Sequence, residues 1–251
     1  MRNKDQIGGL IKGLSLIEAF DAAHTRMTLS EAARRVGISP ASARRCLLTL
    51  VERGYVQTDG KWFWLGHGAL RVAYAYASST RLPRLLQPAL DALSERTRES
   101  ATLSVLDGHD ILIAARSTAR QTMRVGLGVG SRLPLYCSAA GRTLLAAMSA
   151  AQWEPLVKKV SMEALTPKTV VSLTGLRHML QDCRELGYAS CDEEIELGVR
   201  SIAIPMFNQA GQTVAAMSIS TRAERMTSSE MVRQHLPTML RSREWARMRM
   251  G

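Results

Sequence analysis

Two groups of small polar residues in the second half of the chain could bind an anionic small molecule. The first is the run Ser138, Ala139, Ala140 and Gly141, which stands where the chain enters an apolar helix expected to reach Met148. Backbone N–H groups at a helix start have no partners within the helix, so they can hold a carboxylate. The helix dipole and charge-assisted hydrogen bonds, of about 1.5–3 kcal/mol each, would stabilise it.

The second group consists of three serines on two expected strands. Ser218 and Ser220 are two residues apart and therefore face the same side of a sheet, and Ser201 lies on the expected hairpin partner. Hydroxyls that point inward among Ile and Met side chains suit a polar ligand in an apolar cavity. A single serine more often bonds local backbone, so the hypothesis depends on all three converging.

Catalytic chemistry has little support in the sequence. The segment G-L-G-V-G at 126–130 lacks the third glycine of a dinucleotide-binding motif, and no nucleophile elbow or phosphate-binding loop is present. Glu193, Glu194 and Glu196 crowd beside Asp192 in one expected loop, which fits a solvated or capping role better than acid–base catalysis. The sequence therefore predicts no catalytic residue and no enzyme.

Metal and disulfide chemistry is not indicated either. The four cysteines are widely and irregularly spaced, and none of the five histidines stands in a metal-ligand pattern. We expect no metal and no cofactor. Because we find no signal peptide and no apolar run long enough to span a bilayer, we expect a cytoplasmic protein without a membrane partner.

The elements that would position a second kind of surface lie in the first third of the chain. Thr28 is expected to begin a helix as the N-cap of a capping box, and Gly37 to end it in a left-handed conformation. Ser39 then caps a second helix with Pro40 at its first position, and Gly54 closes it. Two short helices joined by so short a turn are typical of a helix-turn-helix that binds double-stranded DNA.

The second of these helices has an inner and an outer face. Ala43 and Leu47 belong to the inner face, which must pack on the first helix of the pair. Leu48 projects outward, and we expect it to meet the first helix of the domain. An amphipathic hairpin with a solvated charged face is the plainer alternative. The residues expected to contact DNA are Ser39, Ala41, Ser42, Arg44, Arg45 and Thr49.

A β-hairpin over 56–65 is expected to form a wing beside the helices. Asp59-Gly60 predicts a two-residue type I′ turn, in which both central residues have positive φ. Lys61 would reach a DNA phosphate from this turn. Trp62 and Trp64 alternate with Phe63, so one face of this strand must stay partly exposed or pack on a neighbouring segment. For the two tryptophans, packing in the core is the expected outcome.

Two further helices flank this module. Leu10, Leu14, Ile17 and Phe20 recur at helical spacing and predict the first helix, so residues 1–66 form a winged helix-turn-helix. Residues 67–81 form a linker helix with an apolar stripe that includes Leu70 and Tyr74. The simplest partner for that stripe is the same helix of a second copy of the chain. A homodimer formed in this way would set the spacing of two DNA half-sites.

Residues 82–251 predict an α+β domain with an antiparallel sheet and helices grouped on one side. The expected helices cover 83–98, the segment up to 148, 172–186 and a final stretch from 228. The expected strands are 102–106, 111–115, 123–127, 201–207 and 214–221.

Charge supports an anionic partner for the first domain. The chain has 251 residues, a net charge of +11 and 46% hydrophobic residues, which is enough for two modest cores. Residues 1–80 carry 11 basic and 6 acidic side chains. The excess favours binding to nucleic acid with an affinity that falls as salt rises.

The whole chain from about Gly9 resembles the IclR-type transcriptional regulators. The resemblance rests on TLSEAARRVGISPASARRCLLTLVERGYV, LPLYCSAAGRTLLA and GYASCDEEIELGVRSIAIPMFNQAGQTVAAMSIS. The runs SARRCLLTLVERGYVQTDG, DILIAARS and SRLPLYCSAAGRTLLAAM further resemble the branch of protocatechuate and p-hydroxybenzoate regulators of aromatic-acid catabolism.

The resemblance implies a winged helix-turn-helix, a GAF-like effector domain and dimers or dimers of dimers on palindromic promoter sites. It implies small carboxylate effectors such as glyoxylate, pyruvate or aromatic acids. Cys191 stands where some relatives have an aspartate. The loss of that carboxylate would suit an anionic or aromatic ligand. The family's ligand contacts correspond here to Ala139, Ala140, Gly141, Cys191, Ser201, Ser218 and Ser220.

We therefore expect a ligand-responsive transcriptional regulator of a catabolic operon that senses a small carboxylate, in particular an aromatic acid of the β-ketoadipate pathway. The alternative is an architectural DNA-binding protein whose second domain only oligomerises. Members of the aromatic-acid branch are often activators, so the sign of regulation stays open.

Overall fold

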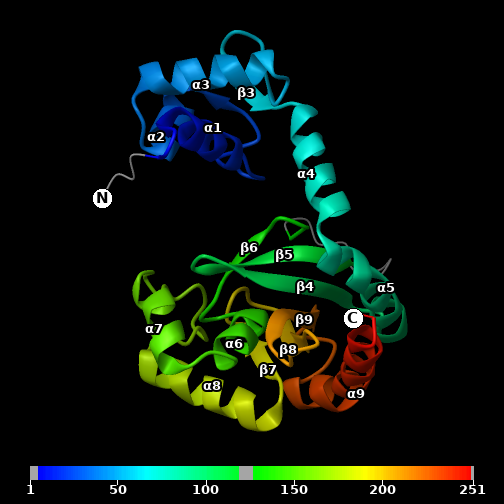
Figure 1. The fold of residues 1–251 in the computed structure, drawn as a ribbon. Coiled ribbons are helices and arrows are strands. Elements are labelled where there is room, and N and C mark those ends of the chain that lie inside the picture. Colours follow the sequence, from blue (N-terminus) through cyan, green and yellow to red (C-terminus); the bar gives the residue numbers. More distant parts are fainter. Residues whose placement is uncertain (1–4, 119–126, 250–251) are drawn as a thin grey trace. The chain divides into compact units, whose positions relative to one another are not determined.

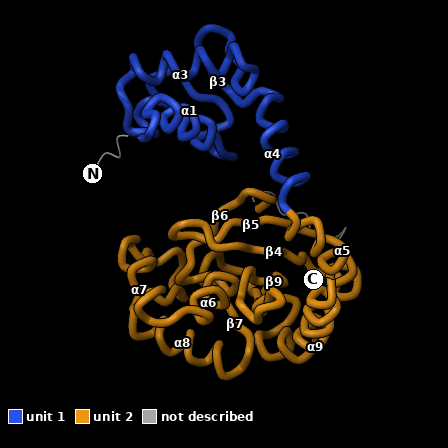
Figure 2. Tube along the Cα trace, in the orientation of Figure 1, with its two compact units in different colours: residues 1–80 blue, residues 81–251 orange. Residues whose placement is uncertain are grey.

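The computed structural model describes residues 5–118 and 127–249, which form two compact units (Figure 2). The first unit runs from Met1 to Thr80 and the second from Arg81 to Gly251. Each unit has its own cluster or clusters of buried hydrophobic side chains.

The first unit is a helical module with a small antiparallel sheet in the order β1-β3-β2 (Figure 1). A cluster of buried side chains that includes Leu16, Leu47 and Phe63 joins the helices to the sheet. Its elements are α1 (Gly8–Glu18), β1 (Met27–Thr28), α2 (Leu29–Val36), α3 (Pro40–Glu52), β2 (Val56–Thr58), β3 (Trp62–Leu65) and α4 (Gly68–Ser79).

The predicted helix caps of α2 and α3 are confirmed. The Thr28 hydroxyl accepts from the Glu31 amide at 3.4 Å, and the Glu31 carboxylate accepts from the Thr28 amide at 2.7 Å. Gly37 ends α2 with φ +69°. The Ser39 hydroxyl accepts from the backbone N–H three residues on, and Pro40 is the first residue of α3. These caps set where α3 begins.

The wing forms as predicted, but its turn type was wrong. Asp59 has no positive φ, and Gly60, with φ +97°, takes the left-handed position alone. The Asp59 carboxylate instead accepts from the amides of Lys61 (3.1 Å) and Trp62 (2.8 Å). The Asp59 side chain thus takes the place of one of the backbone hydrogen bonds that would join the two strands at a type I′ turn.

The core prediction for the two tryptophans was also wrong. Phe63 is the buried residue of β3, whereas Trp62 and Trp64 are half-buried. The guanidinium of Arg26 lies 4.2 Å from the Trp64 ring centre, and the Lys61 ammonium lies 5.7 Å from Trp62. The wing therefore presents cations stacked on aromatic rings.

The predicted stripe on α1 is only partly buried. Leu16 is the fully buried residue of this helix, while Leu10 and Leu14 are exposed. The stripe of α4 is exposed as well at Leu70 and Tyr74. The first unit therefore carries apolar side chains with no cover in the described chain.

Close backbone contacts join the start of α4 to the end of α3. The Gly68 amide donates to the Gly54 carbonyl at 2.9 Å, and the Gly66 amide to the Tyr55 carbonyl at 2.8 Å. A Cβ at position 66 would lie 2.6 Å from the Gly54 oxygen, and one at position 68 would overlap it. Arg71, on the first turns of α4, donates to the Arg53 carbonyl at 2.9 Å. Only glycine permits this junction.

The second unit is built on a six-stranded antiparallel sheet in the order β6-β5-β4-β9-β8-β7 (Figure 1). The strands are β4 (Ser100–Asp107), β5 (Asp110–Ser117), β6 (Arg132–Pro134), β7 (Ala189–Asp192), β8 (Val199–Phe207) and β9 (Thr213–Arg222). The helices are α5 (Arg81–Thr97), α6 (Ala139–Ala146), α7 (Ala150–Lys158), α8 (Leu173–Leu186) and α9 (Ser228–Arg247).

Helices cover both faces of this sheet, not one side as predicted. One cluster of buried side chains joins α6, α7 and α8 to the sheet, and another joins α5 and α9 to its opposite face. The reason is visible on β8, where Ile202, Ala203 and Ile204 are consecutive and all buried. A strand that is apolar on both sides must be covered on both sides.

The predicted hairpins around residues 107–110 and 208–211 are confirmed, and Gly187 ends α8 with φ +76°. The predicted strand over 123–127 falls mostly outside the described residues, and Leu127 itself is not in a strand. In the described parts of the chain, no helix is both long and apolar enough to cross a membrane.

Candidate functional site

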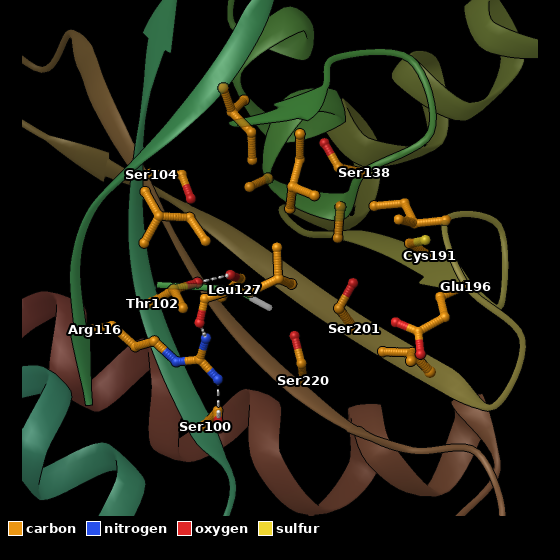
Figure 3. Close-up of a pocket in the computed structure, with 18 of the residues that line it drawn as sticks. Ser100, Thr102, Ser104, Arg116, Leu127, Ser138, Cys191, Glu196, Ser201 and Ser220 are labelled. Carbon is orange, nitrogen blue, oxygen red and sulfur yellow. Dashed lines mark hydrogen bonds between the residues drawn. The ribbon is translucent and has the colours of Figure 1, made fainter. Parts of the chain in front are cut away.

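A cavity of about 100 Å³ lies between the sheet of the second unit and the start of α6 (Figure 3). A single water needs roughly 10–15 Å³ of such space, so a small organic molecule fits. Seven of the eight residues predicted for a ligand line it: Ser138, Ala139, Ala140, Cys191, Ser201, Ser218 and Ser220.

A row of hydroxyls crosses three neighbouring strands on the cavity side of the sheet. Ser220 on β9 is paired with Ser100 on β4 and with Ser201 on β8, and Ser218 is paired with Thr102. The predicted serines are therefore brought together. Sequence reasoning missed Ser100, Thr102 and Ser104, although their alternation along β4 is a signal of one polar face.

Only some of these hydroxyls are free to bind a ligand. Thr102 and Ser218 bond each other, with 2.6 Å between their oxygens. Ser104, Ser201 and Ser220 line the cavity and have no side-chain hydrogen-bond partner among the described residues. An unpaired hydroxyl facing an apolar cavity is poised to bond a polar guest.

At the start of α6, the described structure narrows the predicted anion site to two amides. The Ser138 hydroxyl caps the helix, accepting from the Gly141 amide at 3.0 Å and donating to the Pro134 carbonyl at 2.7 Å. Ala139 and Ala140 are the cavity residues whose N–H groups keep no partner in the described chain. Gly141 is not among the residues that line the cavity.

Gly141 serves packing instead. A Cβ at this position would overlap the Leu135 carbonyl oxygen and lie 2.6 Å from the Leu135 Cα atom. The absence of a side chain lets the helix start press against the segment that follows β6, and so fixes where the two free amides point.

Cys191 contributes a neutral thiol to the cavity wall. Its Sγ lies 3.1 Å from the Cys137 carbonyl oxygen, to which the thiol donates. Burial raises the pKa of Cys191 above its ordinary value, so the thiolate is disfavoured. The residue is a weak donor and an apolar wall, not a nucleophile.

The acidic loop after β7 was predicted to have a solvated or capping role, which does not describe Glu194. Glu194 is 4% exposed and binds Arg142 of α6 through two hydrogen bonds of 2.5 and 2.6 Å. Arg142 also donates to the carbonyls of Tyr136 and Ser190. This buried pair fixes the start of α6 against the loop beyond Cys191, and thereby two walls of the cavity.

Arg116 also lines the cavity and was missed in the sequence. It lies near the end of β5, directly opposite Thr102 of β4. The sequence around Arg116 does not reveal this role, because it depends on how β4 pairs with both β5 and β9. Within residues 5–118 and 127–249, no group of His, Cys, Asp and Glu could hold a metal ion.

In the first unit, α3 has the predicted inner face, with Ala43 and Leu47 fully buried. Ala41, Arg44 and Arg45 are exposed, as is Ser39 before the helix. Ser42, Arg45 and Thr49 border a groove beside α1. Leu48 is 42% exposed and lies outside both that groove and the core.

A capped helix-turn-helix with a wing, followed by an α+β unit with a small-molecule cavity, defines a DNA-binding transcriptional regulator with an effector-binding domain. The family comparisons agree with this class. The model "IclR helix-turn-helix domain" matches residues 9–60, and "Bacterial transcriptional regulator IclR C-terminal" matches residues 74–247. The chain belongs to the IclR family of bacterial transcriptional regulators.

Similar proteins confirm the predicted branch of that family. The Pca regulon regulatory protein of Pseudomonas putida is 38% identical over 237 residues, covering 94% of this chain and 81% of that protein. The p-hydroxybenzoate hydroxylase transcriptional activator of Acinetobacter baylyi is 35% identical, covering 95% and 90%. These relatives are regulators and not enzymes.

A solved structure supports the fold over the whole chain. The crystal structure of a transcriptional regulator from Rhodococcus sp. RHA1 superposes with a TM-score of 0.83 at 36% identity, covering 98% of each chain. The combination of winged helix-turn-helix and curled antiparallel sheet is thus that of known IclR structures.

Proposed function

We propose that this protein controls a catabolic operon by binding operator DNA through α3 and sensing a small carboxylate in the cavity of the second unit. The cavity carries the proposal, because it gathers unpaired hydroxyls and two free helix-start amides in an otherwise apolar space. The names of the relatives, a Pca regulon protein and a p-hydroxybenzoate hydroxylase activator, support an aromatic acid of the β-ketoadipate pathway as the ligand.

The proposed effector contacts are of two kinds. The amides of Ala139 and Ala140, at the positive end of α6, favour a negatively polarised atom. The hydroxyls of Ser201 and Ser220 can donate or accept, and Cys191 adds a thiol. Ser218 is bonded to Thr102, and its hydroxyl has further hydrogen-bonding capacity for a ligand.

The proposed DNA surface is the exposed part of α3 together with the wing. Arg44 and Arg45 can bind guanine bidentately or hold a phosphate, while the small Ala41 and Ser42 allow close approach of the backbone. Lys61 at the wing turn would contact a phosphate. Ser39 and Thr49 complete the surface at its two ends.

The proposed assembly is a homodimer or a dimer of dimers, with the exposed stripe of α4 as one contact. We assign DNA binding to residues 1–66, linkage to residues 67–81 and effector binding to residues 82–251. Effector binding would favour one arrangement of the paired DNA-binding domains. A ligand shifts that equilibrium only by its differential affinity for the two arrangements, typically about 1–3 kcal/mol.

The direct test is a titration of the full-length protein onto DNA from upstream of its own gene. Fluorescence anisotropy at fixed salt, with and without a panel of aromatic and short aliphatic acids, gives operator affinity. We expect at least one acid to change that affinity by about 5- to 150-fold. If no acid of the panel alters affinity or transcription, or raises the melting temperature, the sensor proposal fails and the architectural alternative holds.

The DNA surface has its own test in Arg44→Ala. We expect operator binding to weaken by about 1–3 kcal/mol if Arg44 contacts a base. Arg96→Ala, on α5 of the second unit, is the matched control and should leave affinity unchanged. Equal affinities for wild type and Arg44→Ala would place the DNA contact on another face of α3.

A further inference from the structure

Arg116 places a positive charge at the cavity wall, and no carboxylate in the described chain neutralises it. Its Nε donates to the Thr118 hydroxyl at 3.1 Å, one terminal nitrogen to the Leu127 carbonyl, and the other to the Ser100 hydroxyl at 3.4 Å. All three partners are neutral. A guanidinium has five N–H donors, so further donors remain for a ligand.

The charge is also partly removed from water. Arg116 is half-buried, and burial lowers the pKa of its guanidinium from the ordinary value, with no neighbouring charge among the causes. A desolvated cation without a counter-ion is unfavourable, and an anion that enters the cavity relieves it. The side-chain amide of Gln87 donates to the backbone carbonyl of Arg116 at 3.1 Å. This bond anchors the end of β5, which carries Arg116.

The cavity has two chemically different ends. Figure 3 shows the Arg116 guanidinium beside Ser100 and Ser220, with Ser138 and Cys191 across the cavity from it. Glu196 lies on the Cys191 side of the cavity. The cavity wall also contains apolar side chains, among them Ile111, Ile113, Leu127 and Leu133.

We propose that Arg116 is the counter-ion of the effector and binds its carboxylate, with Ser100 and Ser220 as flanking donors. This proposal rests on the proposed function and specifies how the ligand lies. The acidic group meets Arg116, the apolar body lies along the isoleucines and leucines, and a neutral polar group meets the Ala139 and Ala140 amides near Cys191. The cavity therefore selects acids that carry a second, uncharged polar group at the far end.

Arg222 is the other arginine of the cavity wall, and it is a poorer anchor. Its side chain is 55% exposed and lies 3.3 Å from a Glu224 carboxylate oxygen, so its charge is already solvated and paired. Because both residues are arginines of one cavity, Arg222→Gln is a matched control for Arg116→Gln.

The test compares acids with their neutral amides on the full-length protein by isothermal titration calorimetry. The probes are 4-hydroxybenzoate, benzoate and succinate, each beside its amide. For the wild type we expect an acid to bind at least tenfold more tightly than its amide. In Arg116→Gln the affinity for that acid should fall about 10- to 100-fold, with less than a threefold change for the amide. Arg116→Lys should keep part of the preference, and Arg222→Gln all of it.

The outcomes separate this proposal from the one on which it rests. If an acid binds the wild type and Arg116→Gln binds it equally well, the Arg116 assignment is wrong while the sensor function stands. If none of the acids binds the wild type, both proposals fall. Circular dichroism and the melting temperature of each variant without ligand establish that it is folded, and Arg116→Lys provides the second test if Arg116→Gln is not.

Discussion

His235 is a buried titratable residue on α9 and does not line the cavity. Its Nε2 has no hydrogen-bond partner in the described structure, and the residue is 7% exposed. Burial, and to a lesser degree the charge of Arg225, lowers the pKa of His235 below its ordinary 6.5. The folded protein therefore disfavours the imidazolium, whereas the unfolded chain titrates normally.

The sign of the resulting pH dependence follows from that direction. Because the unfolded state binds the proton more readily, the contribution of His235 to stability is fully present above pH 6.5. It is lost as pH falls from there toward the lower pKa of the folded state, by at most about 1.4 kcal/mol per pH unit. We expect urea unfolding at pH 7.5 and 5.5 to show this loss in the wild type and a smaller one in His235→Phe. Equal losses in both proteins would contradict the assignment.

At the scale of one element, the start of α6 depends on the absence of a side chain at Gly141. The methyl group of Gly141→Ala would overlap the Leu135 backbone, which cannot move without displacing the helix. We expect a destabilisation of about 1–3 kcal/mol, together with weaker binding of any acid that the wild type binds. Thermal unfolding with and without that acid measures both effects.

Gly128→Ala is the control for this substitution, since a Cβ there meets nothing within 4 Å and the backbone has ordinary φ. It should leave the melting temperature nearly unchanged. If Gly141→Ala behaves in the same way, the contact with Leu135 does not determine where α6 begins.

The elements differ in how far sequence alone predicts them. The caps at Thr28 and Ser39 were predictable because capping involves residues only three positions apart. Likewise, the Ser218–Ser220 alternation is visible within one strand. The polar face of β4 acquires its meaning only through pairing with β9, across more than 100 residues of chain, with Ser100 opposite Ser220. Arg116 faces Thr102 across the predicted β4–β5 hairpin, but its place beside the cavity serines depends on β9, which brings Ser218 opposite Thr102.

At the scale of the whole molecule, two separate sets of buried side chains imply two unfolding steps. The cluster of the first unit shares no residue with those of the second. A ligand that binds only the folded second unit stabilises it by RT ln(1 + [L]/Kd), about 2.7 kcal/mol at a hundredfold excess over Kd. We expect differential scanning calorimetry to resolve two transitions, with a bound acid shifting mainly that of residues 81–251. A single transition that shifts as a whole would show that the units unfold together.

The junction at Gly54, Gly66 and Gly68 has a consequence for how such a regulator can diversify. Backbone meets backbone there without intervening side chains. We therefore expect α3 to rotate together with α4. Under the proposed function, new inducers would require changes in the cavity, and new promoters would require changes on the outer face of α3. Neither would require a change at Gly54, Gly66 or Gly68, so under this proposal both preferences can change while the junction stays the same.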